Sequence, residues 1–343
     1  SCIARLIPPN SADCSLPTPA AGRIGQRWRC VRRCGAGRRP AILARGTIIS
    51  PSISADTTVL ERLAVLPQYL LPKQALTILA GKLAASESGN LTTQVIRWFV
   101  SRYGVDLGEA ADADPASYRS FNEFFTRPLR PGARPLADAD FICPVDGAIS
   151  QFGAIARDQI FQAKGHHYTT TALLGGDSGL AARFNDGAFA TLYLSPRDYH
   201  RIHMPVAGRL TRMIHVPGAL FSVNPTTARG VPGLFARNER VVCVFDCDFG
   251  SFVLVLVGAT IVGSMATVWH GTVNPPRSGV LREWSYDAQA PDLGKGDEMG
   301  RFLLGSTVVL LFPADVLRFN PAWSPARPVR MGEAMGERSG RRP

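Results

Sequence analysis

Short apolar runs separated by glycine and proline fill most of the chain after Pro131. Runs of this length that are rich in Val, Leu and Phe are typical of buried β-strands. The clearest five are Ala190–Ser195, Val241–Asp248, Ser251–Ala259, Val280–Tyr286 and Ser306–Phe312. No repeated alternation of strand and helix patterns accompanies them, which argues against a Rossmann or TIM-barrel architecture. The pattern predicts a curved antiparallel sheet or sandwich, with a hairpin turn at Phe249-Gly250.

Helical spacings of apolar residues precede this β-rich body. Leucines recur at such spacings from Val59 to Ala85, and Pro67 and Pro72 divide the stretch into two short helices. Further helices are predicted from Leu91 to Tyr103 and directly after Ser120. The apolar, cation-flanked face of residues 59–85 fits either a hairpin packed on the body or a surface lying in a membrane interface. The predicted fold class is α+β, with N-terminal helices followed by a β-rich antiparallel sheet or sandwich.

The net charge of +11 lies at the two ends of the chain. Residues 1–50 hold nine Arg and one acidic residue, and residues 327–343 hold five Arg and two Glu, so the stretch between them is neutral. A nucleic-acid-binding fold is therefore not indicated. Residues 1–57 are interpreted as a disordered basic arm or as sequence from outside the natural reading frame; a transit peptide is the third alternative, but no amphipathic helix is visible. Residues 314–343, rich in Pro, Arg and Gly, are predicted to be a disordered tail.

Cysteine usage favours free thiols. After residue 57 the chain keeps Cys143, Cys243 and Cys247, an odd number without a CxxC pair. Buried thiols are therefore favoured over a zinc site. No run reaches the roughly 18 apolar residues that are needed to span a bilayer.

Polar residues that could carry chemistry stand beside the predicted strands. Asp146 lies in the turn 144–147, where an Asp-Gly pair usually has only a conformational role. His200 and His203 follow a strand three positions apart. In a helical turn both imidazoles would lie on one side, as in a metal pair or two catalytic bases. The remaining histidines and cysteines supply no recognised ligand spacing, so catalysis is favoured and no metal is predicted.

Ser306 follows Gly305 and opens the last apolar strand. Aspartate, histidine and serine far apart in sequence are the minimum set for an activated hydroxyl. Such a trio also occurs by chance, and the chain has no G-x-S-x-G nucleophile elbow. Two alternatives stay open at this point: a serine hydrolase that uses Asp146, His203 and Ser306, and a non-catalytic carrier domain of the barrel-sandwich type.

Eight ordered stretches of the chain resemble the bacterial-type phosphatidylserine decarboxylases, proenzymes that form their own pyruvoyl group. The stretches are FNEFFTRPLRPGARPL (121–136), PVDGAIS (144–150), FQAKGHHYTTTALLGG (161–176), SPRDYHRIHMPVAG (195–208), FSVNP (221–225), NERVV (238–242), VGATIVGSMATVW (257–269) and KGDEMGRFLLGSTVVLLF (295–312). These stretches lie between residues 121 and 312, the resemblance itself starts near Val59, and it implies one decarboxylase domain over residues 58–313. Residues 1–57 and 314–343 run beyond the expected ends of the family.

The resemblance implies a self-cleavage reaction. The charge-relay aspartate falls on Asp146, which would orient His203, and His203 would deprotonate Ser306. The Ser306 hydroxyl would attack the carbonyl of Gly305 and turn the peptide into an ester, and β-elimination would then split the chain. A β chain ending at Gly305 and an α chain whose residue 306 has become a pyruvoyl group would result.

The resemblance also implies the reaction of the processed protein. The pyruvoyl group would form a Schiff base with phosphatidylserine and accept the electron pair left by carbon dioxide, giving phosphatidylethanolamine. His200 matches the family residue assigned to the protonation step and to the substrate carboxylate, with Asp198 and Tyr199 as neighbours.

The partners and the location follow from the same resemblance. The N-terminal helices would dock peripherally on the cytoplasmic side of the cell membrane, where the substrate resides. The mitochondrial inner membrane is the less favoured location. A homodimer is possible, and no nucleic acid is expected.

Overall fold

The structure, a computed structural model, describes residue 68 and residues 73–260, 264–274, 279–286, 290–303 and 306–340. These residues belong to one compact unit, Ser52–Pro343. The arm predicted for residues 1–57, most of the first helix predicted in residues 59–85, and Gly305 lie outside the described residues.

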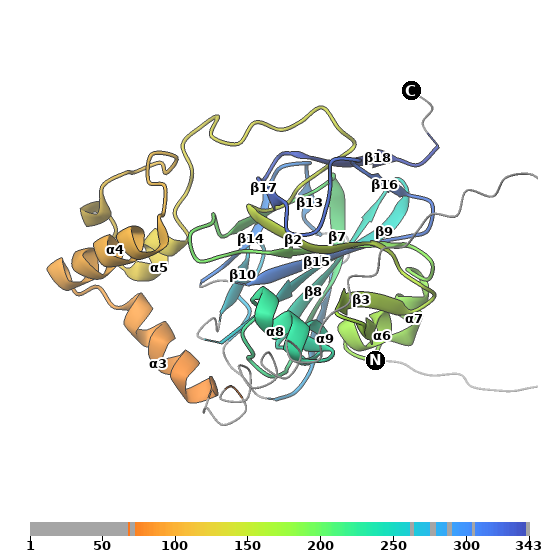
Figure 1. The fold of residues 1–343 in the computed structure, drawn as a ribbon, viewed down its shortest axis with the longest axis horizontal. Helices are drawn as coiled ribbons and strands as arrows, with labels where there is room; N and C mark the ends of the chain where they lie inside the picture. The colour runs from red at the N-terminus through yellow and green to blue at the C-terminus, as the bar shows by residue number, and fades with distance from the viewer. Residues whose placement is uncertain are drawn as a thin grey trace, which may run out of the picture. The chain divides into compact units, whose positions relative to one another are not determined.

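Helices open the described chain, as the leucine spacing predicts (Figure 1). They are α3 (Lys73–Ala85), α4 (Asn90–Tyr103), the 3₁₀ helix η1 (Pro115–Ser117) and α5 (Phe121–Phe125). The hydroxyl of Ser120 caps α5 by accepting the Glu123 N–H, and the Glu123 carboxylate accepts the N–H of Arg119, the residue before the cap. Aromatic side chains of α4 and α5, Phe99 and Phe124 among them, pack into a core of their own.

An antiparallel sheet of nine strands forms the centre of the body, as predicted. Its order is β12-β7-β8-β9-β15-β5-β2-β17, and β13 pairs with β7. The strands are β2 (Gly147–Ala154), β5 (Ala188–Tyr193), β7 (Gly208–Val216), β8 (Arg240–Cys247), β9 (Gly250–Val257), β12 (Arg282–Ser285), β13 (Asp292–Leu293), β15 (Thr307–Phe312) and β17 (Pro328–Val329). The hairpin predicted at Phe249-Gly250 joins β8 to β9, with Cys247 opposite Gly250.

Both faces of this sheet are buried, which explains why β15 is a continuous apolar run. Val308, Leu310 and Phe312 enter one core, whereas Val309 and Leu311 enter the other. Two smaller sheets cover the first face: β6 (Arg201–His203), β10 (Met265–Thr267), β11 (Gly271–Thr272) and β14 (Glu298–Phe302), and then β1 (Phe141–Ile142), β16 (Leu317–Phe319) and β18 (Ala334–Arg338). The second face packs against the hairpin β3 (Gln159–Ala163) and β4 (His166–Thr169), and against α6 (Thr170–Leu173), α7 (Ser178–Ala182), α8 (Pro225–Gly230) and α9 (Leu234–Arg237) (Figure 1).

The predicted disorder of residues 314–343 is wrong for every described residue of that stretch. Strands β16, β17 and β18 lie there, and β17 joins the central sheet by pairing with β2. The Trp323 indole packs against Phe152 and Phe319, and Met335 is fully buried. Two of the three strands hold only two or three residues, too few to show a period of two, so composition alone was misleading.

No helix among the described residues is long and apolar enough to cross a membrane.

Candidate active site

Ser306 stands at the head of β15, in the middle of the central sheet. The next residue, Thr307, pairs with Tyr193 of β5 on one side and with Val257 of β9 on the other. The Leu194 N–H donates to the Ser306 carbonyl at 2.9 Å. The Ser306 side chain is buried, and its hydroxyl has no hydrogen-bond partner in the described part of the chain. A buried hydroxyl without a partner is costly, and such groups are often functional.

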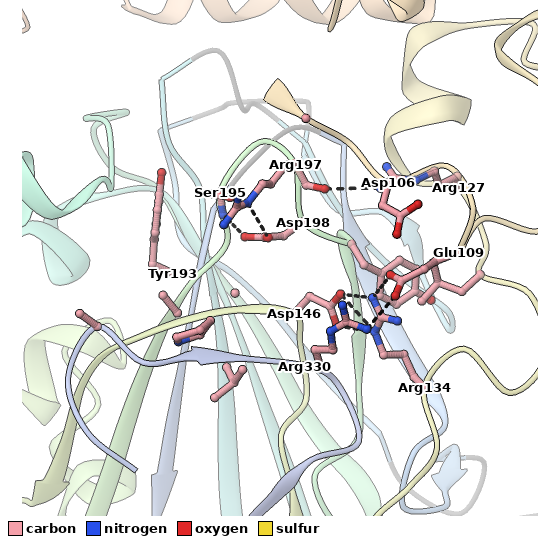
Figure 2. A pocket seen from close by; sticks show the side chains of 18 residues that line it. Asp106, Glu109, Arg127, Arg134, Asp146, Tyr193, Ser195, Arg197, Asp198 and Arg330 are labelled. Atoms are coloured by element: carbon pink, nitrogen blue, oxygen red, sulfur yellow. Dashed lines mark hydrogen bonds and ion pairs between the residues drawn. The ribbon is translucent and has the colours of Figure 1, made fainter. Parts of the chain in front are cut away.

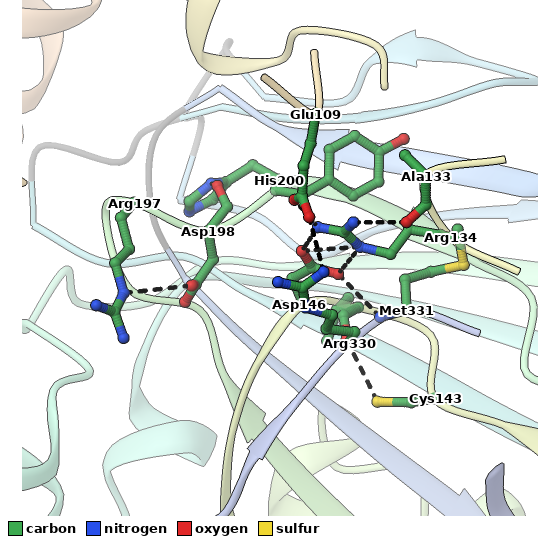
Figure 3. A network of polar contacts seen from close by, with 12 residues as sticks. Glu109, Ala133, Arg134, Cys143, Asp146, Arg197, Asp198, His200, Arg330 and Met331 are labelled. Carbon is green, nitrogen blue, oxygen red and sulfur yellow. Dashed lines mark hydrogen bonds and ion pairs between the residues drawn. The ribbon is translucent and has the colours of Figure 1, made fainter. Parts of the chain in front are cut away.

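Asp146 directly precedes β2 and lies at the same end of the central strands as Ser306. Its carboxylate accepts the Met331 N–H at 2.9 Å and a bidentate contact from Arg134, with Nε 3.0 Å from Oδ1 and Nη2 2.5 Å from Oδ2. Figure 3 shows the Arg134 guanidinium between Asp146 and Glu109, and the Arg134–Glu109 ion pair measures 2.6 Å. Arg330 binds the other oxygen of Glu109.

The Arg134 side chain is only 5% exposed, so its charge depends on these two carboxylates. Burial opposes its ionisation, but the hydrogen bonds that Arg134 donates to Asp146 and Glu109 outweigh burial and raise the pKa of Arg134. The bond from Arg134 in turn lowers the pKa of Glu109. Asp146 is therefore held by one cation and one backbone donor.

His203 ends strand β6, and both of its ring nitrogens have partners. The Gly296 carbonyl, 2.7 Å from Nδ1, can only accept, so Nδ1 carries the proton. The Tyr199 hydroxyl therefore donates to Nε2 at 3.1 Å. Burial lowers the pKa of His203 by more than the bond to Gly296 raises it. His203 is thus a neutral imidazole with its basic nitrogen directed at Tyr199.

His200 precedes β6 and is fully buried. Its Nδ1–H donates to the Asp198 carbonyl at 2.7 Å, and its ring lies 4.1 Å from the ring of Phe125, centroid to centroid. Burial lowers the pKa of His200 to about 3, and the nearby positive charge of Arg127 acts in the same direction. Nε2 is left as a buried, unprotonated nitrogen without a hydrogen-bond partner in the described structure.

The helical turn considered for the two histidines is wrong. His203 belongs to a strand and His200 directly precedes it, and side chains three apart along an extended chain point to opposite sides. His200 accordingly packs on Phe125, whereas His203 contacts Tyr199 and Gly296. The two imidazoles therefore do not form a metal pair.

The direct contact expected between Asp146 and His203 is also absent from the described structure. The carboxylate oxygens of Asp146 are bound to Arg134 and Met331, and the ring nitrogens of His203 are bound to Tyr199 and Gly296. The Ser306 hydroxyl contacts neither imidazole through a hydrogen bond. Asp146 still contributes at longer range, because its negative charge favours protonation of His203 and so raises the pKa of that imidazole, as a smaller effect than burial.

A pocket of about 510 Å³ opens at this edge of the sheet (Figure 2). Its walls come from the loop after α4, the segment after α5, the start of β2, the residues that follow β5, and the C-terminal segment. They include Asp106, Glu109, Arg127, Arg134, Asp146, Tyr193, Ser195, Arg197, Asp198, Tyr199 and Arg330. A polar pocket next to two buried neutral imidazoles and a buried hydroxyl is a candidate active site.

Among the residues that line this pocket, the sequence did not single out Arg127, Arg134 or Glu109. The signal available was the arginine density of residues 127–134, but three arginines stand there and spacing does not reveal which one meets Asp146. Glu109 lies in a loop without a pattern. Of the thiols expected to be buried, Cys143 and Cys243 are buried and Cys247 is partly exposed. No cluster of His, Cys, Asp and Glu suited to a metal ion occurs within the described ranges.

Two family models match the chain. A family model described as phosphatidylserine decarboxylase matches residues 121–337, and a second, described as PSD, matches residues 63–104. The first match reaches beyond residue 313, so the segment with β16, β17 and most of β18 is part of the family domain and not an extension.

Close relatives carry one name. The chain is 77% identical over 276 residues to the phosphatidylserine decarboxylase proenzyme of Dechloromonas aromatica (strain RCB), covering 80% of this chain and 98% of that protein. It is 76% identical over 277 residues to that of Azoarcus sp. (strain BH72), covering 81% and 96%. The corresponding protein of Albidiferax ferrireducens is 73% identical over 275 residues, covering 80% and 97%.

The relatives' shared name does not favour a serine hydrolase or a carrier domain. The family match covers the buried Ser306, the Arg134–Asp146 pair and both histidines within one continuous stretch. From its fold, this site and these matches, the chain belongs to the phosphatidylserine decarboxylase family.

Proposed function

We propose that this chain is a self-processing proenzyme that decarboxylates phosphatidylserine to phosphatidylethanolamine at the cell membrane. The observation that carries the proposal is the buried Ser306 hydroxyl, which has no hydrogen-bond partner among the described residues and lies at the end of the central sheet that also holds Asp146. The smaller sheet with β6, which packs on the same core, brings the neutral imidazoles of His200 and His203. The relatives' printed name, phosphatidylserine decarboxylase proenzyme, supports both the reaction and the processing.

Processing requires a base for the Ser306 hydroxyl. His203 suits this role because it is neutral and its Nε2 carries the lone pair. To act, Nε2 exchanges its bond from Tyr199 for one from Ser306, while Gly296 keeps the ring in the same tautomer. The Ser306 oxygen attacks the carbonyl carbon of Gly305, and the amide becomes an ester. Loss of the Ser306 α-proton then expels the Gly305 carboxylate, and hydrolysis of the remaining dehydroalanine releases ammonia.

The product of these steps is a pyruvoyl group at residue 306, and the site suits it because it derives from a side chain already buried there. When present, the group supplies an electrophilic carbonyl that takes up a primary amine and accepts the electron pair left by carbon dioxide. His200 contributes the proton chemistry. Its Nδ1–H is fixed on the Asp198 carbonyl, so Nε2 is the atom that takes up and returns a proton.

Three substitutions test this proposal. Ser306→Ala should remain one uncleaved chain without decarboxylase activity, as measured by denaturing gel and by release of carbon dioxide from phosphatidylserine vesicles. His203→Ala should fail to cleave. His200→Ala should cleave but decarboxylate about 10²- to 10⁴-fold more slowly, the usual loss when a general acid–base is removed. Normal processing of His203→Ala would remove that residue from the cleavage step.

We further propose that α3 and α4 dock the protein peripherally on the cytoplasmic side of the membrane. Both helices leave large apolar side chains exposed, among them Leu79, Leu83, Leu91 and Trp98, with exposures of 56–64%. An apolar groove of about 480 Å³ runs between the two helices. Such a face with Trp at its rim suits the boundary between headgroups and acyl chains.

Vesicle sedimentation tests the docking. The double variant Leu83→Asp/Trp98→Asp should lose most of its binding to phosphatidylserine vesicles and still process normally. Val280→Asp, on an apolar residue exposed elsewhere, is the matched control and should bind like the parent. Unchanged binding of the double variant would place the membrane contact on another surface.

A further inference from the structure

Arg127 is a buried cation without an acidic partner. Arg127 is only 3% exposed, yet no carboxylate among the described residues forms an ion pair with its guanidinium. Among the described residues its hydrogen bonding is limited to one long contact, 3.5 Å from Nη2 to the Arg197 carbonyl, and Nε has no partner there. The Phe124 ring, 5.3 Å from the guanidinium carbon, offers a weak cation–π contact. A buried charge left in this way is strongly destabilising unless a counter-charge arrives.

The Arg127 side chain lines the 510 Å³ pocket of the candidate active site (Figure 2). The other charges of this pocket are already engaged. Asp146 and Glu109 bind Arg134, and Glu109 also binds Arg330. Asp198 accepts the Ser195 N–H at 2.6 Å, and its other oxygen lies 3.9 Å from Nε of the exposed Arg197 side chain. The remaining carboxylate, that of Asp106, accepts the Gly108 N–H at 2.8 Å. Arg127 is therefore the charged group in this pocket whose partner would have to be a ligand, and that ligand would be an anion.

The chemistry of the proposed reaction decides which anion suits Arg127. Phosphatidylserine carries a carboxylate and a phosphodiester. A cation beside the carboxylate would stabilise the ground state and oppose its loss as neutral carbon dioxide. The phosphodiester keeps its charge from substrate to product, so a guanidinium bound to it does not raise the activation barrier of decarboxylation. Arginine also matches phosphate oxygens through its planar fork of donors.

The position of the pocket favours a lipid headgroup over free phosphate. Gly104, the residue directly after α4, lines the pocket, and α4 leaves Leu91 and Trp98 exposed. On the other side Arg127 follows Phe125 by two residues, and the Phe125 ring lies 4.1 Å from the ring of His200. A ligand with apolar chains on α4 and a reacting headgroup near His200 would carry its phosphodiester past Arg127.

We propose that Arg127 is the phosphodiester-binding residue of the active-site pocket. This assignment rests on the proposed function for the identity of the lipid, but it is tested by binding and not by turnover. The probes are glycerophosphoethanolamine and ethanolamine, titrated calorimetrically into the processed protein. Both probes carry the amine, and only the first carries the phosphodiester, so the ratio of their affinities isolates the phosphate contribution.

Arg127→Met should lower that ratio roughly 10- to 100-fold, the value of a charge-assisted hydrogen bond. Arg130→Met, three residues along and exposed, is the matched control and should keep the parent ratio. The melting temperature of Arg127→Met should be unchanged or higher, because the variant removes an unpaired buried charge. If it does not fold, Arg127→Lys replaces it, and it should still bind the diester more weakly since it lacks the fork.

A parent-like ratio in the variant that folds would overturn the proposal. Inorganic phosphate that binds the parent as tightly as glycerophosphoethanolamine would also overturn the assignment to a lipid headgroup. A third outcome is that the parent binds the diester but does not decarboxylate phosphatidylserine, and that Arg127→Met loses this binding. The assignment of Arg127 would then be upheld. That result would leave the proposed function alone contradicted.

Discussion

Burial sets the protonation of both site histidines at the scale of single residues. His200 and His203 each donate Nδ1–H to a backbone carbonyl, which fixes the tautomer and leaves Nε2 as the basic atom. Burial lowers the pKa of both imidazoles, so both are neutral near pH 7. A neutral imidazole can act as a base without first losing a proton, which is what the cleavage step needs.

These lowered pKa values predict a loss of stability in acid. An unfolded histidine titrates near pH 6.5, whereas burial lowers the pKa of His200 to about 3. Between these values the unfolded chain binds a proton that the folded chain does not, so the free energy of unfolding decreases as the pH falls below about 6.5. The loss approaches about 1.4 kcal/mol per pH unit for this imidazole.

Melting curves from pH 7 to pH 5 measure this effect. His200→Gln should show a shallower fall in melting temperature than the parent, because glutamine does not titrate. His270→Gln removes an exposed imidazole and should keep the parent slope. Parallel curves for the parent and His200→Gln would show that the pKa of His200 is the same in the folded and the unfolded chain, and would contradict this prediction.

Arg134 and Arg330 make a matched pair for testing the network around Asp146. The Arg134 side chain is 5% exposed and serves two carboxylates, whereas that of Arg330 is 59% exposed and serves only Glu109. Arg134→Ala leaves two carboxylates without their buried partner and should cost about 3–5 kcal/mol. Arg330→Ala should cost at most about 1 kcal/mol, as for an exposed ion pair.

Urea unfolding of the two variants, together with their rate of chain cleavage, checks this prediction. Arg134→Ala should also cleave slowly, because Asp146 loses the cation that orients it. Equal stability losses for the two variants would show that the network does not depend on the buried arginine.

At the scale of elements, the C-terminal segment completes the site although it follows the serine by more than twenty residues. Strand β17 pairs with β2 directly beside Asp146, and the Met331 N–H binds the carboxylate of Asp146. Strand β18 lies between β1 and β16 and pairs with both of them in a small sheet. The loop after β17, which follows the proposed cleavage site, therefore orients Asp146, which precedes that site.

Truncation tests this dependence. A chain that ends at residue 325 loses β17, β18 and the Met331 donor, so it should be less stable and should not cleave. A chain that ends at Gly340 loses only residues 341–343 and is the matched control, which should cleave at the parent rate. Cleavage of the shorter chain at the parent rate would show that Asp146 does not need the C-terminal segment.

At the scale of the whole molecule, regular patterns were predictable and contacts between distant segments were not. The apolar run of β15 and the apolar spacing of α3 and α4 are long enough to show their period, and they gave the α+β class correctly. Strands such as β17 hold two residues, and only their partners in the sheet define them. The resemblance predicts roles for Asp146, His200, His203 and Ser306, but it does not give the partners that the structure places around them.

The reason lies in the topology of the sheet. Asp146 meets Met331 across 185 residues, and His203 meets the Gly296 carbonyl across 93. No local propensity encodes such pairs, because they depend on the order of strands that meet at one edge. The segment with His200 and His203 was mispredicted because its strand pairing also depends on distant residues. Residues three apart share one side in a helix, whereas in a strand they point to opposite sides.

The same topology predicts that cleavage does not separate the two chains. Strand β15 lies between β9 and β5 and is buried on both faces, so the short chain, residues 306–343, is held by the centre of the sheet. Size-exclusion chromatography without denaturant should give one species that contains both chains. Loss of the short chain under these conditions would contradict the paired position of β15.

The intact mass of the purified protein under denaturing conditions tests the central claim most directly. The proposed processing predicts two species, the smaller one comprising residues 306–343 with a pyruvoyl group in place of Ser306. Its N-terminus should resist Edman degradation, because it has no amine. A single full-length mass from folded protein would contradict the self-processing proenzyme, as would a short chain that begins with an intact serine.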